Sequence, residues 1–344
     1  MRRRDFLTGT LLASAAAATA GCSTGAQPGA IRLSGPLPRV PPLPREYARK
    51  VSRIPVLAWH QVAGGHATTP ALDVIWDYNR DCSPAAAVCD APGNDETVSL
   101  AQMDAQLGWL KAQGWQSVTA AQYTAWAAGK PVPLPAKPVL LTVDDGTLNS
   151  YVGVTAVLAR YGFSMVTFIV TQFADGATAN LEPYVGWNAS WDQLLSLPEE
   201  QWSFAFHAGA HGHNIAFPDN AACQYYYPCQ LPSETVSDYR SRVAGEIAAG
   251  RAVASARLGT RMNDVMWAVP WGDLGNQGLP ATGDARTWLA PWAATQVPVI
   301  FIQDPARNGH LNERYRLVVQ GNWSLEAFRR NFSGNVSDGF FDAT

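Results

Sequence analysis

The sequence predicts an α/β fold in which a parallel sheet is wrapped by helices. Short apolar runs bounded by turns alternate along the chain with segments of helical periodicity. Several of these runs end in aspartate or histidine, as expected where parallel strands present side chains to a ligand at their carboxyl ends. The chain has 344 residues, of which 47% are hydrophobic, so one α/β barrel of about 250 residues with appendages fits its length.

Residues 1–22 resemble an export signal. They begin with arginines, continue with an apolar stretch over residues 6–20, and end in small residues before Cys22. The stretch is shorter than the about 20 residues that span a bilayer. "RRDFL" at residues 3–7 resembles a twin-arginine signal, and "TAGC" at residues 19–22 resembles a bacterial lipobox. We expect an exported lipoprotein on the outer face of the cell membrane, attached only by its lipid; the alternative is ordinary cleavage that leaves no lipid.

Residues 23–52 are rich in proline and glycine and lack apolar periodicity. In polyproline geometry, at about 3.1 Å per residue, such a segment is a semi-rigid tether that holds a domain away from a membrane. We therefore expect one folded domain over residues 53–344, and we expect it to be monomeric.

Four cysteines remain when Cys22 is set aside, and they form two pairs that are close in sequence. Cys82 lies near Cys89, and Cys223 lies near Cys229. In an oxidising compartment each pair predicts a disulfide that closes a short loop. Free thiols are the alternative. A cysteine zinc site is disfavoured because neither pair has the C-x2-4-C spacing.

The charge of the chain argues against nucleic acid as a partner. The formal net charge is -3 and the sequence pI is about 6.1. The clustered arginines Arg2, Arg3 and Arg4 lie in the expected signal segment, so no basic surface for a phosphate backbone is predicted.

The elements follow in order along the domain. Residues 54–58 predict the first strand, which leads to His60, and a long polar insertion follows it. A helix should begin at a capping box formed by Ser99 and Gln102 and end at Gly114. Residues 117–129 predict a short strand and a helix, and further apolar runs predict strands at 139–143, 202–206 and 297–304. The residues of the capped helix spaced to face the core are Met103, Leu107 and Leu110.

The run "VLLTV" at residues 139–143 ends in Asp144, Asp145 and Gly146. At the carboxyl end of a parallel strand, two carboxylates lie at the mouth of the ligand pocket. Because successive side chains on a strand point to opposite sides, the two aspartates should have different partners and different roles. A helix-capping aspartate beside a turn aspartate is the alternative interpretation.

A second polar cluster follows the run at residues 202–206. The sequence "HAGAHGHN" places His207, His211 and His213 in one glycine-containing loop. Such a cluster at a strand end can bring imidazoles around one cation. One carboxylate with two histidines and an open position suits a metal that activates water, and the same ligand set also serves non-haem iron oxygenases.

At these residues the sequence resembles the polysaccharide deacetylases of carbohydrate esterase family four, and most of all their poly-β-1,6-N-acetylglucosamine deacetylase group. "LTVDDG" resembles the family motif T-F-D-D-G, "HAGAH" resembles H-[ST]-x-x-H, and "WAVPWG" resembles R-x-P-Y-G without its arginine. Further similarity lies in "IPVLAWHQV", "ETVSDYRSRVAGEI" and "RYRLVVQGNWSLEAF". The matching segments occur in the family's order from about residue 53 to residue 332.

The resemblance implies a distorted (β/α)7 barrel that hydrolyses N-acetyl groups of a polysaccharide. It implies that Asp145 and two histidines hold a divalent cation, most often zinc, and that Asp144 is the general base. This division agrees with the chemistry, since one carboxylate neutralises the metal while the other stays free to accept a proton. The backbone N–H of Trp271 matches the position that stabilises the oxyanion.

The departures from the family pattern leave several assignments open. His207 corresponds to the first histidine ligand, whereas His211 and His213 compete for the second, and four-residue spacing favours His211. The arginine that holds the general base has no counterpart in "WAVPWG". The family's late leucine-x-histidine motif is also absent, so His60 is the candidate general acid; a structural histidine bonded to backbone is its alternative.

Other classes of protein fit the sequence less well. No G-x-S-x-G nucleophile elbow of a serine esterase occurs. Adjacent aspartates do not supply the two carboxylates about 5 to 9.5 Å apart that a glycoside hydrolase needs. A catalytically silent glycan-binding relative is the serious alternative. Tryptophans that could stack on sugars, each of which could equally lie in the core or at the barrel rim, are Trp59, Trp187, Trp271 and Trp292.

Overall fold

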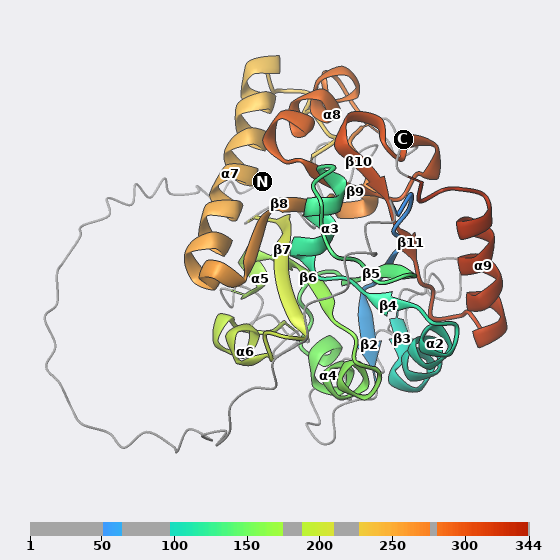
Figure 1. Cartoon of the computed structure of the whole chain (residues 1–344). Coiled ribbons are helices and arrows are strands. Elements are labelled where there is room, and N and C mark those ends of the chain that lie inside the picture. The colour runs from blue at the N-terminus through green and yellow to red at the C-terminus, as the bar shows by residue number, and fades with distance from the viewer. Residues whose placement is uncertain (1–50, 64–96, 175–187, 210–226, 276–280, 343–344) are drawn as a thin grey trace, which may run out of the picture. The chain divides into compact units, whose positions relative to one another are not determined.

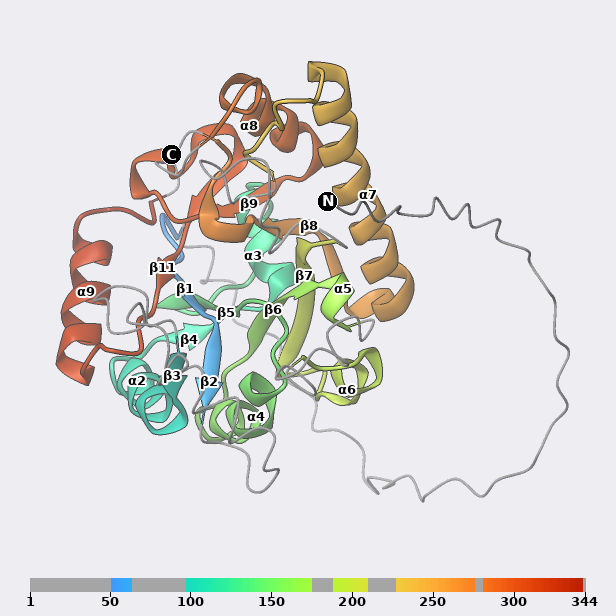
Figure 2. The same cartoon turned by 180° about the vertical axis from the view of Figure 1, so that it is seen from behind.

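The computed structural model describes residues 51–63, 97–174, 188–209, 227–275 and 281–342. Within them the chain forms strands that alternate with helices around one parallel sheet (Figures 1 and 2). The strands are β1 (Val56–Trp59), β2 (Gln61–Ala63), β3 (Thr97–Ser99), β4 (Gln116–Ser117), β5 (Pro138–Val143), β6 (Met165–Val170), β7 (Trp202–Ala208), β8 (Met262–Ala268), β9 (Val299–Ile302), β10 (Glu313–Tyr315) and β11 (Leu317–Val318).

The longer helices cover the outside of this sheet (Figures 1 and 2). The first of them, α2, begins at the predicted capping box, where Ser99 and Gln102 each bond to the other's backbone N–H. The α-helices are α2 (Leu100–Ala112), α3 (Ala120–Ala127), α4 (Asn149–Tyr161), α5 (Thr171–Ala174), α6 (Trp191–Ser196), α7 (Val236–Leu258), α8 (Ala285–Gln296) and α9 (Leu325–Ser337). Short 3-10 turns are η2 (Gly259–Arg261), η3 (Pro270–Gly272), η4 (Pro305–Arg307) and η5 (His310–Asn312).

The strand order is β10-β9-β8-β7-β6-β5-β1-β11, and every pairing in it is parallel. Its two ends, β10 and β11, are consecutive pieces of one segment, separated only by Arg316. This segment, Glu313–Val318, pairs with β9 through its first half and with β1 through its second half. The sheet therefore returns to its first strand as a nearly closed barrel with seven strand positions, which confirms the predicted (β/α)7 architecture.

Strand alternation divides the apolar side chains of the barrel between an interior and an exterior cluster. The interior cluster takes every second residue of each strand, for example Val56, Leu140, Ala205 and Phe301. Their neighbours in sequence belong to the clusters that pack under the surrounding helices. In the interior, α3 contributes Tyr123, whose ring lies 5.5 Å from that of Phe301.

The sequence predicted most strand positions but placed one boundary too early. Strand β7 runs on to Ala208, so His207 belongs to the strand rather than to the following loop. The reason is its side chain: His207 continues the inward positions of β7 after Ala205 and is buried there. His211 and His213 lie outside the described residues, as do the signal segment 1–22, residues 23–50 of the predicted tether 23–52, and four of the five cysteines.

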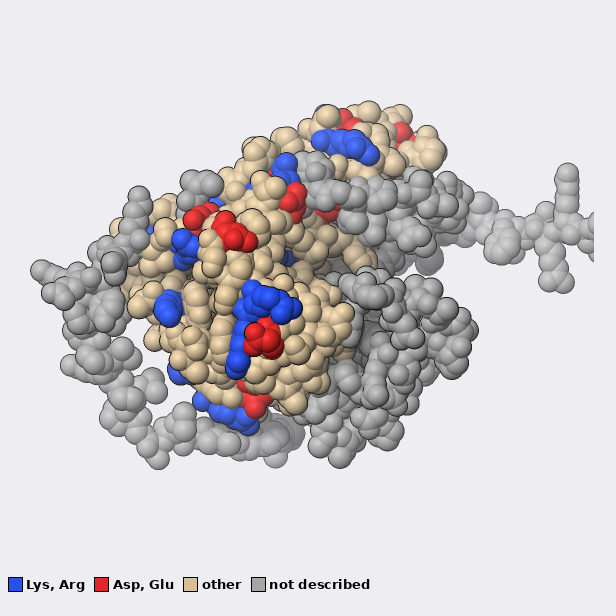
Figure 3. Space-filling model, turned by 90° about the vertical axis from the view of Figure 1, so that its right-hand side faces the viewer, with Lys and Arg blue, Asp and Glu red and all other residues tan. Residues whose placement is uncertain are grey.

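The charges on the surface are mixed. On the face shown in Figure 3, Lys and Arg lie close to Asp and Glu, and no broad area among its described residues carries a single sign of charge. No helix in the described part of the chain is long and apolar enough to cross a membrane.

Cys229 is buried and disulfide-bonded. Its expected partner Cys223 is outside the described residues, so this pairing stays a prediction.

Candidate active site

The strand alternation that builds the barrel interior also gathers the polar residues of the site. His60 continues the inward positions of β1, Asp144 those of β5, and His207 those of β7. All three follow the apolar interior cluster at the carboxyl ends of their strands, where ligands bind in parallel α/β folds. Apolar residues therefore fill the barrel, and polar residues occupy its mouth.

The two adjacent aspartates have different surroundings. Asp144 is fully buried, whereas the Asp145 side chain is 16% exposed. The backbone turns sharply here, since Asp145 has φ 70° and Gly146 has φ 76°. The Gly146 N–H donates to the Asp144 carbonyl at 2.9 Å. A non-glycine residue in the left-handed region is uncommon and often marks a functional site.

Arg316 holds Asp144 through a bidentate ion pair. Its two terminal nitrogens donate to Oδ1 at 2.6 Å and to Oδ2 at 2.5 Å, and both side chains are completely buried. Burial on its own raises the pKa of Asp144. The guanidinium of Arg316, aided by the two nearby imidazoles, outweighs burial, so that pKa is lowered from its ordinary value. Asp144 is thus a fixed, ionised carboxylate in an apolar setting.

The sequence reasoning did not find Arg316. It noted the absence of an arginine from "WAVPWG" and left the neighbour of Asp144 unassigned. The structure supplies the guanidinium from the segment that closes the barrel, where the Arg316 N–H also donates to Ile302 at 3.0 Å. The segment "RYRLVVQGNW" was part of the family resemblance, but nothing local distinguishes this arginine from its neighbours.

His207 is held with one ring nitrogen toward the aspartates. Nδ1 lies 2.6 Å from the Ala268 carbonyl, which can only accept, so Nδ1 carries the proton. Nε2 then faces Asp145 Oδ1 at 3.4 Å and Asp144 Oδ2 at 3.9 Å. A carbonyl that fixes the tautomer in this way is typical of histidines that bind metals.

His60 approaches the same carboxylate oxygen of Asp144 as His207 does. Its Nε2 is 3.6 Å from Asp144 Oδ2, and its side chain is 11% exposed. Both oxygens of Asp144 therefore accept from Arg316, and the His60 imidazole lies near Oδ2. This position makes a proton exchange between His60 and a group at the mouth of the barrel geometrically feasible.

The donors around Asp145 fit a divalent cation. Two ligands held about 2.1 Å from a tetrahedral zinc lie roughly 3.4 Å apart, and the distance between Asp145 Oδ1 and His207 Nε2 is 3.4 Å. No group of three potential metal ligands is found among the described residues. The expected third ligand, His211 or His213, lies outside them. The two described donors therefore agree with the predicted ligand set without completing it.

The part of the chain that carries most of these residues is similar to known proteins. Residues 132–275 match the polysaccharide deacetylase family, a range that contains both aspartates, His207 and Trp271. This part of the chain is therefore similar to a polysaccharide deacetylase domain. The family description confirms the resemblance drawn from "LTVDDG" and "HAGAH".

Individual similar proteins extend the comparison. The chain is 27% identical over 195 residues to the poly-beta-1,6-N-acetyl-D-glucosamine N-deacetylase of Escherichia coli K12, a match that covers 52% of this chain and 28% of that relative. It thus spans less than a third of the relative's length. Among solved structures, a de-N-acetylase from Aggregatibacter actinomycetemcomitans has a TM-score of 0.56 at 19% identity, covering 81% of this chain and 99% of that one.

A second solved structure shows the same fold. The BpsB deacetylase domain of Bordetella bronchiseptica has a TM-score of 0.54 at 20% identity, covering 78% of this chain and 96% of that one. At these identities the likeness concerns the fold, and it places the nearly closed parallel barrel among known deacetylase structures.

Trp271 lies at the rim of the barrel, in η3 directly after β8. It has φ 61° and ψ 4°, and its side chain is 45% exposed. For a bulky residue this backbone conformation costs free energy. The oxyanion role of its N–H remains a prediction, but the strained turn and the exposed ring place Trp271 where a substrate could reach it.

The remaining candidates from the sequence have structural positions. Trp59 is fully buried in the exterior core, and Trp292 stacks on Trp288 with ring centroids 4.9 Å apart. The structure thus gives Trp59 a packing role, while Trp187 lies outside the described residues.

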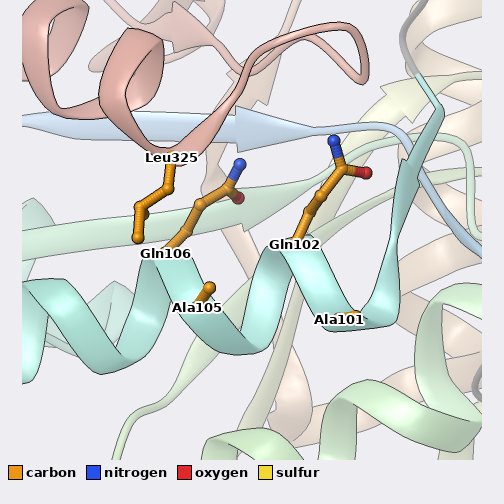
Figure 4. Close-up of a pocket in the computed structure, with 5 residues that line it drawn as sticks. All are labelled: Ala101, Gln102, Ala105, Gln106 and Leu325. Atoms are coloured by element: carbon orange, nitrogen blue, oxygen red, sulfur yellow. The ribbon is translucent and has the colours of Figure 1, made fainter.

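One pocket of about 240 Å³ is separate from the active site. It lies between α2 and the start of α9, as Figure 4 shows, and none of the active-site residues lines it. Its buried member Gln106 accepts from Trp59 Nε1 at 3.1 Å. The pocket therefore lies on the outer side of β1. Its lining residues are Ala101, Gln102, Ala105, Gln106 and Leu325.

Proposed function

We propose that this protein is a metal-dependent N-deacetylase of a polysaccharide similar to poly-N-acetylglucosamine. The match to the deacetylase family and the name of the matched Escherichia coli enzyme support the substrate class. The proposal rests on the observation that two neighbouring carboxylates have different partners. Asp144 is paired with Arg316 in the barrel interior, while Asp145 faces His207.

Asp145 and His207 would hold the divalent cation, with His211 or His213 as a further ligand. We propose zinc, because carboxylate and imidazole donors at tetrahedral spacing suit it. When bound, such a cation supplies Lewis acidity, which polarises the acetyl carbonyl and lowers the pKa of water.

Asp144 is the general base in this proposal. It accepts the proton of the water molecule that attacks the acetyl carbon. Arg316 keeps the carboxylate ionised and prevents it from rotating toward the cation, so its role remains distinct from that of Asp145. Placing a base in hydrogen-bond reach of its proton typically contributes about 10²- to 10⁴-fold in rate.

His60 is the general acid and Trp271 the oxyanion donor. As the C–N bond of the tetrahedral adduct breaks, His60 gives a proton to the departing nitrogen, which leaves as a free amine beside acetate. The imidazole Nε2 lies 3.6 Å from Asp144 Oδ2, so the proposed acid and base lie side by side at the mouth of the barrel. The Trp271 N–H would donate to the oxygen on which negative charge develops.

Acetate release from a panel of defined N-acetylated glycans tests the proposal. Asp145→Asn and His207→Ala should lose metal and activity together, because a neutral amide or a methyl group replaces a ligand. Asp144→Asn should retain the metal and lose about 100-fold or more in rate. Loss of metal in Asp144→Asn with retention in Asp145→Asn would reverse the two roles.

The same panel of glycans tests whether the protein is instead a catalytically silent relative that only binds glycans. A purified protein that binds a glycan, holds no divalent metal and releases no acetate from any member would be a catalytically silent relative. The Asp144–Arg316 pair favours the enzyme, because it supplies the guanidinium that "WAVPWG" in this chain lacks at the family's usual place.

A further inference from the structure

The backbone leaves the barrel at His60. Strand β1 belongs to the barrel and ends at Trp59, whose carbonyl accepts from the Asp144 N–H at 2.9 Å. Strand β2 begins one residue later and pairs with β3 in a separate sheet beside α4 (Figures 1 and 2). Where the chain passes from one sheet to the other, at His60, the row of strand-to-strand hydrogen bonds is interrupted. The backbone groups at this break need other partners.

Ser150 supplies those partners. Its hydroxyl donates to the His60 carbonyl at 3.0 Å and accepts from the Val62 N–H at 3.3 Å. The Thr147 hydroxyl lies 2.6 Å from the same oxygen. Because the single proton of Ser150 goes to His60, Thr147 must be the donor in that third bond. Both hydroxyl side chains are buried. The Ser150 oxygen thus bonds to the backbone on both sides of the break and is itself held by Thr147.

These bonds also tie the aspartate loop to His60. Thr147 and Ser150 follow Asp144 and Asp145 in the same turn, at the start of α4. Movement of the His60 backbone relative to this loop would break at least one buried hydrogen bond, which costs more than an exposed one. The Ser150 bonds therefore add to the backbone bond between Asp144 and Trp59 in holding His60 near Asp144.

We propose that Ser150, supported by Thr147, is a positioning residue that holds His60 where it can protonate the departing amine. This inference rests on the proposed deacetylase function and deepens it. Ser150 is buried beneath the break and acts only through the backbone of His60. Sub-ångström placement of a catalytic group has large effects on rate, so a hydroxyl that touches no substrate can still affect the acid step.

The proposal predicts a dependence on the leaving group. An amine must be protonated as the C–N bond breaks, whereas an activated phenolate leaves without a proton. Removing the Ser150 hydroxyl should therefore slow acetate release from an N-acetylated glucosamine oligomer by about 10-fold or more, as a partial loss of general acid catalysis. Hydrolysis of 4-nitrophenyl acetate by the same metal-loaded protein should change much less.

The experiment compares Ser150→Ala with Thr142→Val on both substrates. Thr142 is a matched control, since its buried hydroxyl likewise donates to a backbone carbonyl of β1, that of Leu57, at 2.9 Å, but does not bond to His60. We expect the ratio of amide to ester kcat to fall about 10-fold in Ser150→Ala, to remain within about twofold in Thr142→Val, and to recover in Ser150→Thr. Metal content and KM for the oligomer should be unchanged in all three.

Equal losses on the two substrates in Ser150→Ala, with the wild-type enzyme active, would overturn the positioning role and leave the proposed function intact. A wild-type protein that releases no acetate from any N-acetylated oligomer would overturn both. If Ser150→Ala does not fold, Thr147→Val carries the test, because it removes only the supporting bond. An unchanged amide-to-ester ratio in a folded Thr147→Val would then contradict the proposal.

Discussion

Replacing Arg316 by methionine should destabilise the protein far more than an arginine at the surface would. The guanidinium and the Asp144 carboxylate are both fully buried and joined by bonds of 2.6 and 2.5 Å. Arg316→Met leaves that carboxylate without its main partner, and breaking a buried pair in this way costs about 3 to 5 kcal/mol. Arg316→Lys keeps the positive charge but loses the two parallel hydrogen bonds of the guanidinium, and it should lower the free energy of unfolding by about 1.5 to 3 kcal/mol.

Arg240 offers a matched control. It makes the same bidentate contact, with Asp284, but is 45% exposed. Arg240→Met should destabilise the protein much less than Arg316→Met does, because solvent screens an exposed pair. Urea denaturation of all variants, with chelator and with added zinc, measures these differences. A loss below about 1 kcal/mol in Arg316→Met would refute the reasoning.

A double variant and a pH series sharpen this prediction. Asp144→Asn removes the buried charge, so adding it to Arg316→Met should restore part of the lost stability rather than add a further loss. The pH dependence has a definite sign. The lowered pKa of Asp144 contributes stability that is present above its unfolded pKa and lost as the pH falls through the folded value. The deficit of Arg316→Met should therefore shrink in acid, where the carboxyl is protonated in both proteins.

Three further predictions concern residues outside the described part of the chain. Cys22→Ala should move the protein from the membrane fraction to the soluble exported fraction, since acyl burial contributes about 0.8 kcal/mol per methylene; unchanged membrane association would reject the lipid anchor. Mass mapping without reductant should join Cys223 to Cys229, a short-loop disulfide worth about 2 kcal/mol, and free thiols would contradict it. Elemental analysis of His211→Ala and His213→Ala should show metal loss in one only, and equal retention in both would remove the loop from the ligand set.

Local patterns predicted the parts of the fold that depend on local physics. The capping box at Ser99 marked the start of α2, and the apolar run before Asp144 marked β5. The same pattern misplaced His207, because a polar residue at the end of an apolar run resembles a loop residue. Only the alternation of β7 into the barrel interior shows that His207 continues the strand.

The partners of Asp144 could not be predicted in the same way. Arg316 lies 172 positions away in sequence and reaches the site only because the barrel closes. Ser150 was likewise missed, since its role depends on where β1 leaves the sheet. Sequence motifs identified the groups that do the proposed chemistry, whereas the groups that hold them depend on tertiary pairing.

The segment that closes the barrel also completes the active site, and this has a consequence for folding. Leu57 of β1 pairs with Leu317, 260 positions later. One edge of β1 therefore stays unpaired until most of the chain has been synthesised. Contacts this distant in sequence form slowly, and an unpaired edge invites association with other chains. Arg316 arrives with the same segment, so an intermediate that lacks the closing strand also leaves Asp144 without its guanidinium. Recovery of activity during refolding should therefore coincide with closure of the barrel and lag behind the formation of its helices.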